Sequence, residues 1–375
     1  MNNHTTNNKK PFLFGLNNAS HDFTNPTSLG KNIFTNAFPI SIAQYLSLKK
    51  GLDIPLIIAD IDDGKIITRH TMKSWNEIIK ADAKSACFKF EEVFRGFCPY
   101  TKTSPNKSDI VIEDSSGNHT RAFEVKLVVV PNSQTADRSH DEQSCEIVVR
   151  PPSIEQLAFS IADSYGASRR TELLDIITDC LGNPMDYQWS SETWMLDKIS
   201  KIVKASNAIV KRGIDLQTPF ALTAIWRTEG QKPVLENQAF DIFSWTDMAF
   251  LQLFIDKSTD DAKSRKTQGK HITRPERSLI WLISALFDYA AQKTLNFSKH
   301  HSKITYGAQT DKAGSFAGDI PLKHLNSLEF KKPRILKSEL EQIISREAFN
   351  YLMPERRLDS AIMIQHLLNS EKEED

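Results

Sequence analysis

The sequence predicts a mixed α/β (α+β) protein in which a central mixed β-sheet is flanked by helices. Short runs rich in Ile, Val and Phe, each bounded by turn-forming residues, are typical of strands and recur in both halves of the chain. Longer segments with apolar residues at helical spacing lie between and after these runs. Strands and helices in this order indicate a sheet covered by helices.

The first 95 residues predict a tail, a helix and a β-hairpin. Residues 1–11 are polar and Asn-rich, so we expect a disordered N-terminal tail. Helical spacing predicts a helix over 39–49. The runs IPLIIAD and KIITRH, joined by Asp-Asp-Gly, predict a hairpin over 54–70. We expect a short helix over 71–79 capped by Thr71, whereas 85–95 is an apolar run that the pattern leaves unassigned.

The middle of the chain is its most regular β region. The run SDIVIED (108–114) is followed by the turn-forming cluster SSGNHT and then by RAFEVKLVVV (121–130), a long and mostly buried strand. A polar loop leads to a third strand, CEIVVRP (145–151), which two prolines end. Helices are predicted at 153–164, 170–181 and 191–211.

The second half continues the alternation. FALTAIW (220–226) predicts a strand, and SWTDMAFLQLFID (244–256) predicts a helix. A strong amphipathic helix is expected over 277–293. Two further helices, at 337–350 and 355–369, precede an acidic tail, 371–375.

Composition and charge restrict the function less than the motifs do. Lysine plus arginine equals aspartate plus glutamate, 47 each, so net charge points to no partner and does not exclude a basic DNA-binding face. The four cysteines form no Cys-x-x-Cys pair, which predicts free, mostly buried thiols rather than a zinc site. Without a signal-like segment or a run of about 18 apolar residues, we expect a cytoplasmic protein with no membrane partner.

One constellation of charged residues carries chemistry. Asp109 begins the first of the two central strands, and Glu124 and Lys126 lie two residues apart on one face of the next. If the strands pair through the SSGNHT turn, Asp109 meets them at one end of the hairpin. Two carboxylates there, with the carbonyl of Val125, suit a hard cation such as Mg²⁺. A lysine beside that cation orients a water or stabilises developing charge in phosphodiester hydrolysis.

The same residues also fit a plain cross-strand ion pair on a solvated face, because Glu-x-Lys is a common tripeptide. The chain contains a second copy of the residue pattern at a shorter spacing, Asp319 followed by Glu329-Phe330-Lys331. That copy has Pro321 after the aspartate and Pro333 after the lysine, and no strand-like run separates its charges. Spacing alone therefore leaves catalysis and a surface ion pair open.

The arrangement SD…EVK resembles the core of the PD-(D/E)xK nuclease superfamily, with Ser108 where a proline is usual. Four segments further resemble the HindVP-like type II restriction endonucleases: LFGLNNASHDFTNPTSLGKNIFTNAFPISIAQYL, SDIVIED, AFEVKLVVVPN and CEIVVRPPSI. The resemblance covers roughly residues 12–165. It implies a restriction-endonuclease-like core, with Asp109 and Glu124 as metal ligands, Lys126 as catalytic lysine, and a short, partly degenerate palindrome of the form GRCGYC as the DNA target.

Other residues are weaker candidates for this chemistry. A fourth acid often joins such cores, and Glu91, Glu92 and Glu146 are candidates, each of which also fits an ordinary surface position. The stretch KSRKTQGKHITRPER (263–277) has a loop-like composition and an excess of basic residues that suits phosphate or guanine contacts. Its candidate DNA-binding residues are Arg265, Lys266, Lys270 and Arg274.

Together these observations predict a Mg²⁺-dependent type II restriction endonuclease that acts on double-stranded DNA. A palindromic target favours a homodimer, and a cognate DNA methyltransferase is expected as a genetic partner without direct contact. We expect one extended domain over 12–370, with its catalytic core at about 85–215 and a helical, DNA-contacting part at about 216–370. The alternatives are a repair or recombination nuclease on the same core and a non-catalytic DNA-binding protein.

Overall fold

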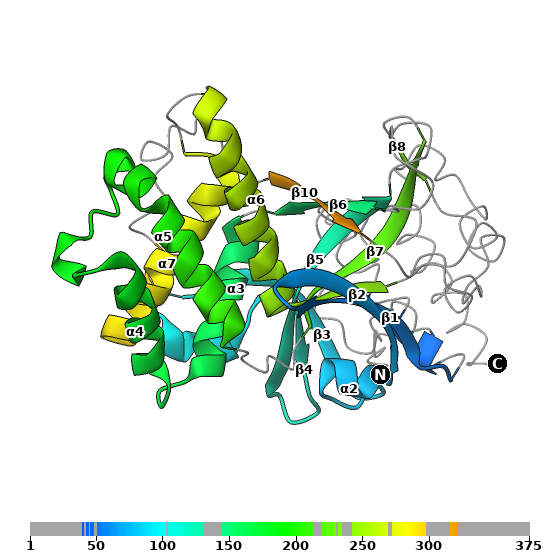
Figure 1. Ribbon diagram of the computed structural model, residues 1–375. Helices are drawn as coiled ribbons and strands as arrows, with labels where there is room; N and C mark the ends of the chain where they lie inside the picture. Colours follow the sequence, from blue (N-terminus) through cyan, green and yellow to red (C-terminus); the bar gives the residue numbers. More distant parts are fainter. Residues whose placement is uncertain are drawn as a thin grey trace, which may run out of the picture.

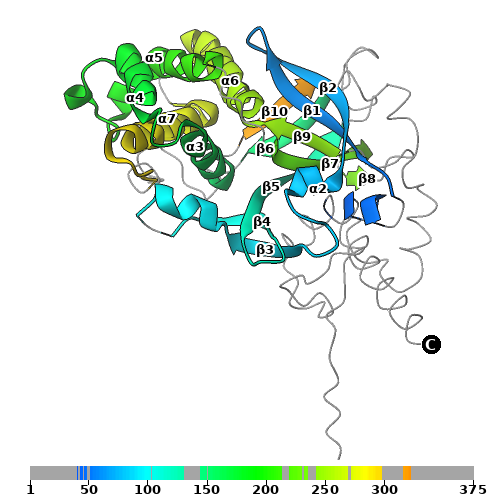
Figure 2. The same cartoon turned by 90° about the horizontal axis from the view of Figure 1, so that it is seen from below.

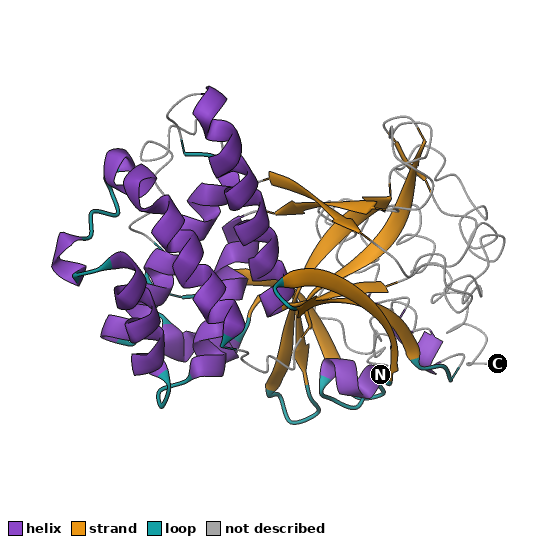
Figure 3. Ribbon diagram, viewed as in Figure 1, coloured by secondary structure: helices purple, strands orange, loops and turns teal. Residues whose placement is uncertain are grey.

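The computed structural model separates helices from strands into two layers (Figures 1 and 3). It describes residues 40, 43–44, 46–48, 51–102, 104–130, 144–149, 151–212, 219–229, 232–234, 242–268, 272–297 and 316–321. Outside these ranges lie the predicted tails 1–11 and 371–375 and the predicted helices 337–350 and 355–369. Within them, the mixed sheet and its covering helices confirm the predicted fold class.

Strands from distant parts of the sequence form one mixed sheet in the order β10-β6-β5-β7-β9-β1-β2. Strand β5 is parallel to β7, and β1 is parallel to β9, whereas the other neighbours in this order are antiparallel. Strands β3 and β4 join the sheet through β5, and β8 extends it beside β7. The strand bounds are β1 Ile54–Asp62, β2 Lys65–Lys73, β3 Cys87–Val93, β4 Lys107–Glu113, β5 His119–Val130, β6 Ser144–Val149, β7 Pro219–Glu229, β8 Lys232–Val234, β9 Ile242–Thr246 and β10 Phe316–Pro321.

The predicted N-terminal hairpin is confirmed as β1 and β2. Its two turn residues, Asp63 and Gly64, both have positive φ, at 45° and 71°. A two-residue hairpin turn with positive φ at both positions matches the right-handed twist of the strands it joins, and Asp-Gly is a favoured pair for it. The hairpin forms one edge of the sheet and is strongly curved (Figures 1 and 2).

The central hairpin is also confirmed, and it carries the predicted acids. Strands β4 and β5 are antiparallel from Glu113–His119 to Ile110–Phe123, and the turn between them lies within the SSGNHT cluster. From Glu124 onward, β5 pairs instead with β7. Strand β5 therefore changes its described neighbour between Phe123 and Glu124.

Helices α3, α4, α5, α6 and α7 lie together on one side of the sheet (Figure 1). Of these, α3 and α6 contact the sheet, and α4, α5 and α7 pack against them and one another. The buried core between the layers combines aliphatic residues of α3 such as Leu157 and Ile161 with aromatic residues such as Trp245 and Phe250. The bounds are α2 Trp75–Ile79, η1 Arg95–Tyr100, α3 Pro151–Tyr165, α4 Arg170–Leu181, η2 Pro184–Asp186, α5 Glu192–Lys211, α6 Asp247–Gln268 and α7 Arg274–Gln292.

Three predicted elements were wrong in extent. Residues 71–73 belong to β2, and the following helix begins at Trp75 with Ser74, not Thr71, as its N-cap. The helix predicted from 244 begins at Asp247, because 242–246 pair in the sheet as β9. The stretch 263–277 is not mainly loop, since α6 continues to Gln268 and α7 begins at Arg274.

The cysteines only partly match the expectation. Cys87, Cys98 and Cys180 are free, as predicted, but Cys98 is exposed and the other two are half-buried, so the expected burial was wrong for these three. Within the described ranges, no helix is long and apolar enough to cross a membrane.

Candidate active site

The end of the central hairpin brings Asp109 next to the Glu124 segment. The register of β4 and β5, continued one residue beyond the pair Ile110–Phe123, places Asp109 opposite Glu124. The Asp109 carboxylate accepts the backbone N–H of Val125, with 2.7 Å between Oδ2 and N. Because residues directly opposite on antiparallel strands project to the same face, the two acids share one face of the hairpin.

The change of neighbour along β5 explains why the Asp109 side chain lies here. The N–H of Val125 lies beyond the last β4–β5 backbone pair, at the position where β5 has begun to pair with β7. Buried backbone N–H groups require an acceptor. The Asp109 carboxylate supplies one, so folding of the strand junction fixes this carboxylate directly.

The first turns of α3 lie against the same end of the hairpin. The Ser153 hydroxyl donates to Glu124 Oε1 at 3.2 Å, and the Ser108 hydroxyl donates to Gln156 Oε1 at 3.1 Å. Ser153 and Glu124 are almost fully buried, at 0% and 3% exposed. Polar side chains this deeply buried are stable where they are hydrogen-bonded, as these are.

Glu155 is an acid at this site that sequence reasoning missed. It is 5% exposed and accepts a hydrogen bond from the Asn106 amide. Burial raises the pKa of Glu155 to about 7; the Asn106 hydrogen bond opposes this rise, and the Glu124 charge adds to it. The only sequence signal was the run Ser-Ile-Glu-Gln in the first turns of a helix, where an acid is ordinarily explained by the helix dipole.

Lys126 follows Glu124 by two residues on β5, and its backbone pairs with Thr223 of β7. Alternation along a strand places the two on the same face. The lysine side chain lies outside the described residues.

The three other candidate acids lie on neighbouring strands. Glu92 of β3 is opposite Ser108, one residue before Asp109, and Glu91 precedes it on the same strand. Glu146 of β6 is opposite Val129, five residues beyond Glu124, or about 16 Å along the strand at about 3.3 Å per residue. Position along the sheet therefore favours β3 over β6 as the source of a further acid.

The candidate DNA-binding residues belong to two helix ends. Arg265 and Lys266 are in the last turns of α6, and Arg274 is the first residue of α7. Their side chains, and Lys270 as a whole, lie outside the described residues. The basic stretch is thus a connection between two consecutive helices that pack against each other.

The donor chemistry of the hairpin end fits a hard divalent cation. Asp109 and Glu124 supply carboxylate oxygens from adjacent strands, and oxygen is the ligand that Mg²⁺ prefers. Among the described residues, no three His, Cys, Asp or Glu side chains converge as a complete metal site. Any cation here would therefore complete its coordination with groups such as the Val125 carbonyl, water or substrate phosphate.

A second buried carboxylate on the helical side provides a useful contrast. Asp247, at the start of α6, is fully buried and accepts a hydrogen bond from Ser160 of α3. Burial raises the pKa of Asp247 to about 7, opposed by the Ser160 hydrogen bond and by the Arg121 charge. Arg121 is 4% exposed. The Ser160 hydrogen bond joins α3 to α6, and the Arg121 charge on β5 adds electrostatic stabilisation, so packing of the helices accounts for this carboxylate.

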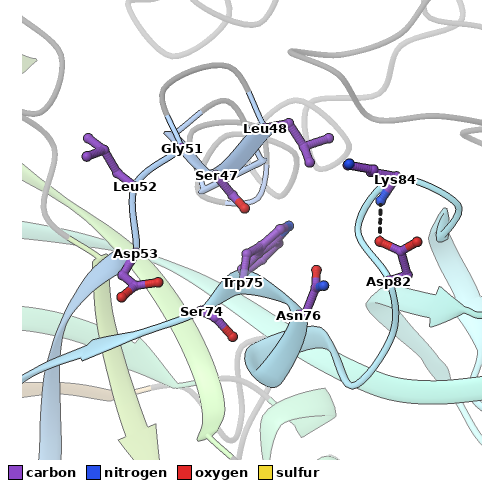
Figure 4. Close-up of a pocket in the computed structure, with 10 residues that line it drawn as sticks. All are labelled: Ser47, Leu48, Gly51, Leu52, Asp53, Ser74, Trp75, Asn76, Asp82 and Lys84. Atoms are coloured by element: carbon purple, nitrogen blue, oxygen red, sulfur yellow. Dashed lines mark hydrogen bonds between the residues drawn. The ribbon is translucent and has the colours of Figure 1, made fainter.

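A separate cavity of about 250 Å³ lies beside α2 (Figure 4). Its lining includes Asp53, Ser74 and Trp75, and the backbone N–H of Lys84 donates to Asp82 at 3.1 Å across one wall. None of the predicted site residues lines it.

Comparison with known proteins assigns the family. The model of the HindVP restriction endonuclease family matches residues 29–368, well beyond the segments 12–165 that carried the resemblance in sequence. The type II restriction enzyme HgiDI of Herpetosiphon aurantiacus is 33% identical over 360 residues, covering 94% of this chain and 96% of that enzyme. The probable type II restriction enzyme HindVP of Haemophilus influenzae is 29% identical over 362 residues, covering 95% and 94%. No solved structure matches. The chain belongs to the HindVP restriction endonuclease family.

Proposed function

We propose that this protein is a Mg²⁺-dependent type II restriction endonuclease that cuts double-stranded DNA at a short palindromic site, with GRCGYC as the form that the family resemblance implies. The observation that carries the proposal is the pairing of Asp109 with the Glu124 segment on one hairpin, in a chain whose family is that of restriction endonucleases. A homodimer would present two such sites to the two strands of a palindrome.

Each residue of the site has a distinct task in this proposal. Asp109, anchored on the Val125 N–H, and Glu124, anchored on Ser153, hold the cation with the Val125 carbonyl. A bound Mg²⁺ supplies charge neutralisation at the scissile phosphate and lowers the pKa of a water. Lys126 orients the attacking water or stabilises the charge that develops on the phosphate. Hydrolysis leaves a 5′-phosphate and a 3′-hydroxyl.

DNA contact is proposed for the connection between α6 and α7. Arg265 and Arg274 are candidates for guanine contacts in the major groove, and Lys266 and Lys270 for phosphate contacts. Lysine and arginine in such a segment contribute to binding mainly through the release of counterions from the DNA backbone.

Digestion of a plasmid of known sequence with the purified protein and Mg²⁺ tests the proposal. We expect discrete fragments whose ends map to one palindrome, and protection of that palindrome by the cognate methyltransferase. A continuous smear of products would instead identify a repair or recombination nuclease. Retarded but uncut DNA would identify a DNA-binding protein whose carboxylates are structural.

A further inference from the structure

Helix α3 is attached to the candidate active site by three side-chain hydrogen bonds. Ser153 donates to Glu124, Ser108 donates to Gln156, and Asn106 donates to Glu155. Ser108 lies on β4 and Asn106 directly precedes it, whereas Glu124 lies on β5. The start of α3 is therefore fixed to both strands that carry the predicted metal ligands.

Resting on the proposed role of Glu124 as a cation ligand, we propose that Ser153 is a positioning residue that sets the affinity of the site for Mg²⁺. Ser153 fixes the orientation of the Glu124 carboxylate through its hydrogen bond. Removal of a group that orients a metal-binding side chain commonly weakens metal binding about 10- to 100-fold.

Helix α3 also carries a hydroxyl with a structural task. Ser160 donates to the buried carboxylate of Asp247 on α6, which the Arg121 charge also stabilises, and none of these residues belongs to the proposed site.

The same helix provides a matched pair of variants. Ser153→Ala and Ser160→Ala each remove an α3 hydroxyl that donates to a buried carboxylate, but only Ser153 contacts the site. Mg²⁺ binding to the full chain is measured by isothermal titration calorimetry without DNA, and the Mg²⁺ concentration for half-maximal plasmid cleavage is measured alongside. We expect Ser153→Ala to raise both the dissociation constant and the half-maximal concentration about tenfold or more, with cleavage largely restored at saturating Mg²⁺. Ser160→Ala should leave both values unchanged.

Ser153→Cys provides a second arm because it keeps the side-chain shape and replaces the hydroxyl with a much weaker donor. We expect it to weaken Mg²⁺ binding about tenfold with no loss of thermal stability. If Ser153→Ala does not fold, Ser153→Cys alone decides the proposal. Wild-type Mg²⁺ affinity in every folded variant of the two overturns it.

Glu124→Gln separates this inference from the proposed function. If Glu124→Gln cuts DNA at the wild-type rate, the assignment of the active site fails. If Glu124→Gln is inactive while Ser153→Ala and Ser153→Cys keep wild-type Mg²⁺ dependence, only the role of Ser153 fails.

Discussion

Replacement of Asp109 by asparagine separates the two tasks assigned to this side chain. Its carboxylate accepts the Val125 N–H at 2.7 Å and is proposed to bind the cation. Asparagine keeps an oxygen acceptor of the same length but carries no charge. The variant should therefore fold and bind DNA, yet fail to hold the cation needed for cleavage.

The structure sets the expected size of both effects. A hydrogen bond to a charged group contributes about 1.5–3 kcal/mol and a neutral one about 0.5–1.5 kcal/mol, so Asp109→Asn should lower the free energy of unfolding by about 1 kcal/mol. Asp109→Ala leaves the Val125 N–H without this acceptor and should cost about 1–3 kcal/mol. A bound metal stabilises the transition state by several kcal/mol. Taken as about 4 kcal/mol, the loss of this stabilisation slows cleavage about 10³-fold.

Urea unfolding and single-turnover cleavage of plasmid DNA measure these two quantities on the same preparations. Asp114→Ala is the matched control, because Asp114 at the opposite end of the same hairpin accepts the N–H groups of Ser116 and Asn118 at 2.8 and 2.9 Å. It should weaken the turn and leave the cleavage rate unchanged. Cleavage by Asp109→Asn within tenfold of the wild-type rate would refute the reasoning, as would an equal loss in Asp114→Ala.

Three further predictions concern the catalytic lysine, the buried acid of α6 and the DNA contacts. Lys126→Ala should abolish cleavage while retaining site-specific binding, measured by gel retardation in Ca²⁺; near wild-type cutting would exclude its catalytic role. Burial raises the pKa of Asp247 to about 7, so the folded state keeps this proton to higher pH than the unfolded chain does. The free energy of unfolding should therefore decrease as the pH rises from about 4 to about 7. In Asp247→Asn, measured by urea unfolding from pH 4 to 8 beside wild type, this decrease should be absent, and identical pH profiles would contradict the assignment. Arg265→Ala and Arg274→Ala should each weaken specific DNA binding by about 1–3 kcal/mol if the arginine contacts guanine. If the arginine contacts phosphate instead, each should reduce the salt dependence of binding by about one ion. Filter binding at several salt concentrations distinguishes these outcomes, and unchanged binding removes the residue from the interface.

Turns and helices that are determined by neighbouring residues in the chain were predicted correctly from the sequence. Asp63 and Gly64 adopt the positive φ values that their hairpin turn requires, and the helices predicted at 170–181 and 191–211 match α4 and α5 within one residue at each end. The prediction failed where a distant strand decided the outcome. Residues 244–246 were predicted as the start of a helix, but they belong to β9, which pairs with β7 and β1.

The candidate site was likewise predictable from the sequence only in part. A hairpin between 108 and 130 was predictable from alternating strands and a turn, and it was sufficient to bring Asp109 opposite Glu124. Glu155 was not predictable, because 31 residues separate it from Glu124 along the chain and only the packing of α3 brings their charges into interaction. An acid in the first turns of a helix has no periodicity that distinguishes burial at a site from solvent exposure.

The two proposed ligands are held by different parts of the fold, and this has a mechanical consequence. Asp109 is anchored on the backbone of β5, at the point where that strand exchanges β4 for β7. Glu124 is anchored on a hydroxyl of α3. Their relative position therefore depends on how α3 packs against the hairpin. A small displacement of the first turn of α3 would separate the two carboxylates while leaving the β4–β5 register intact, so the contacts of that turn, rather than those farther along α3, are expected to affect cation binding before they affect folding.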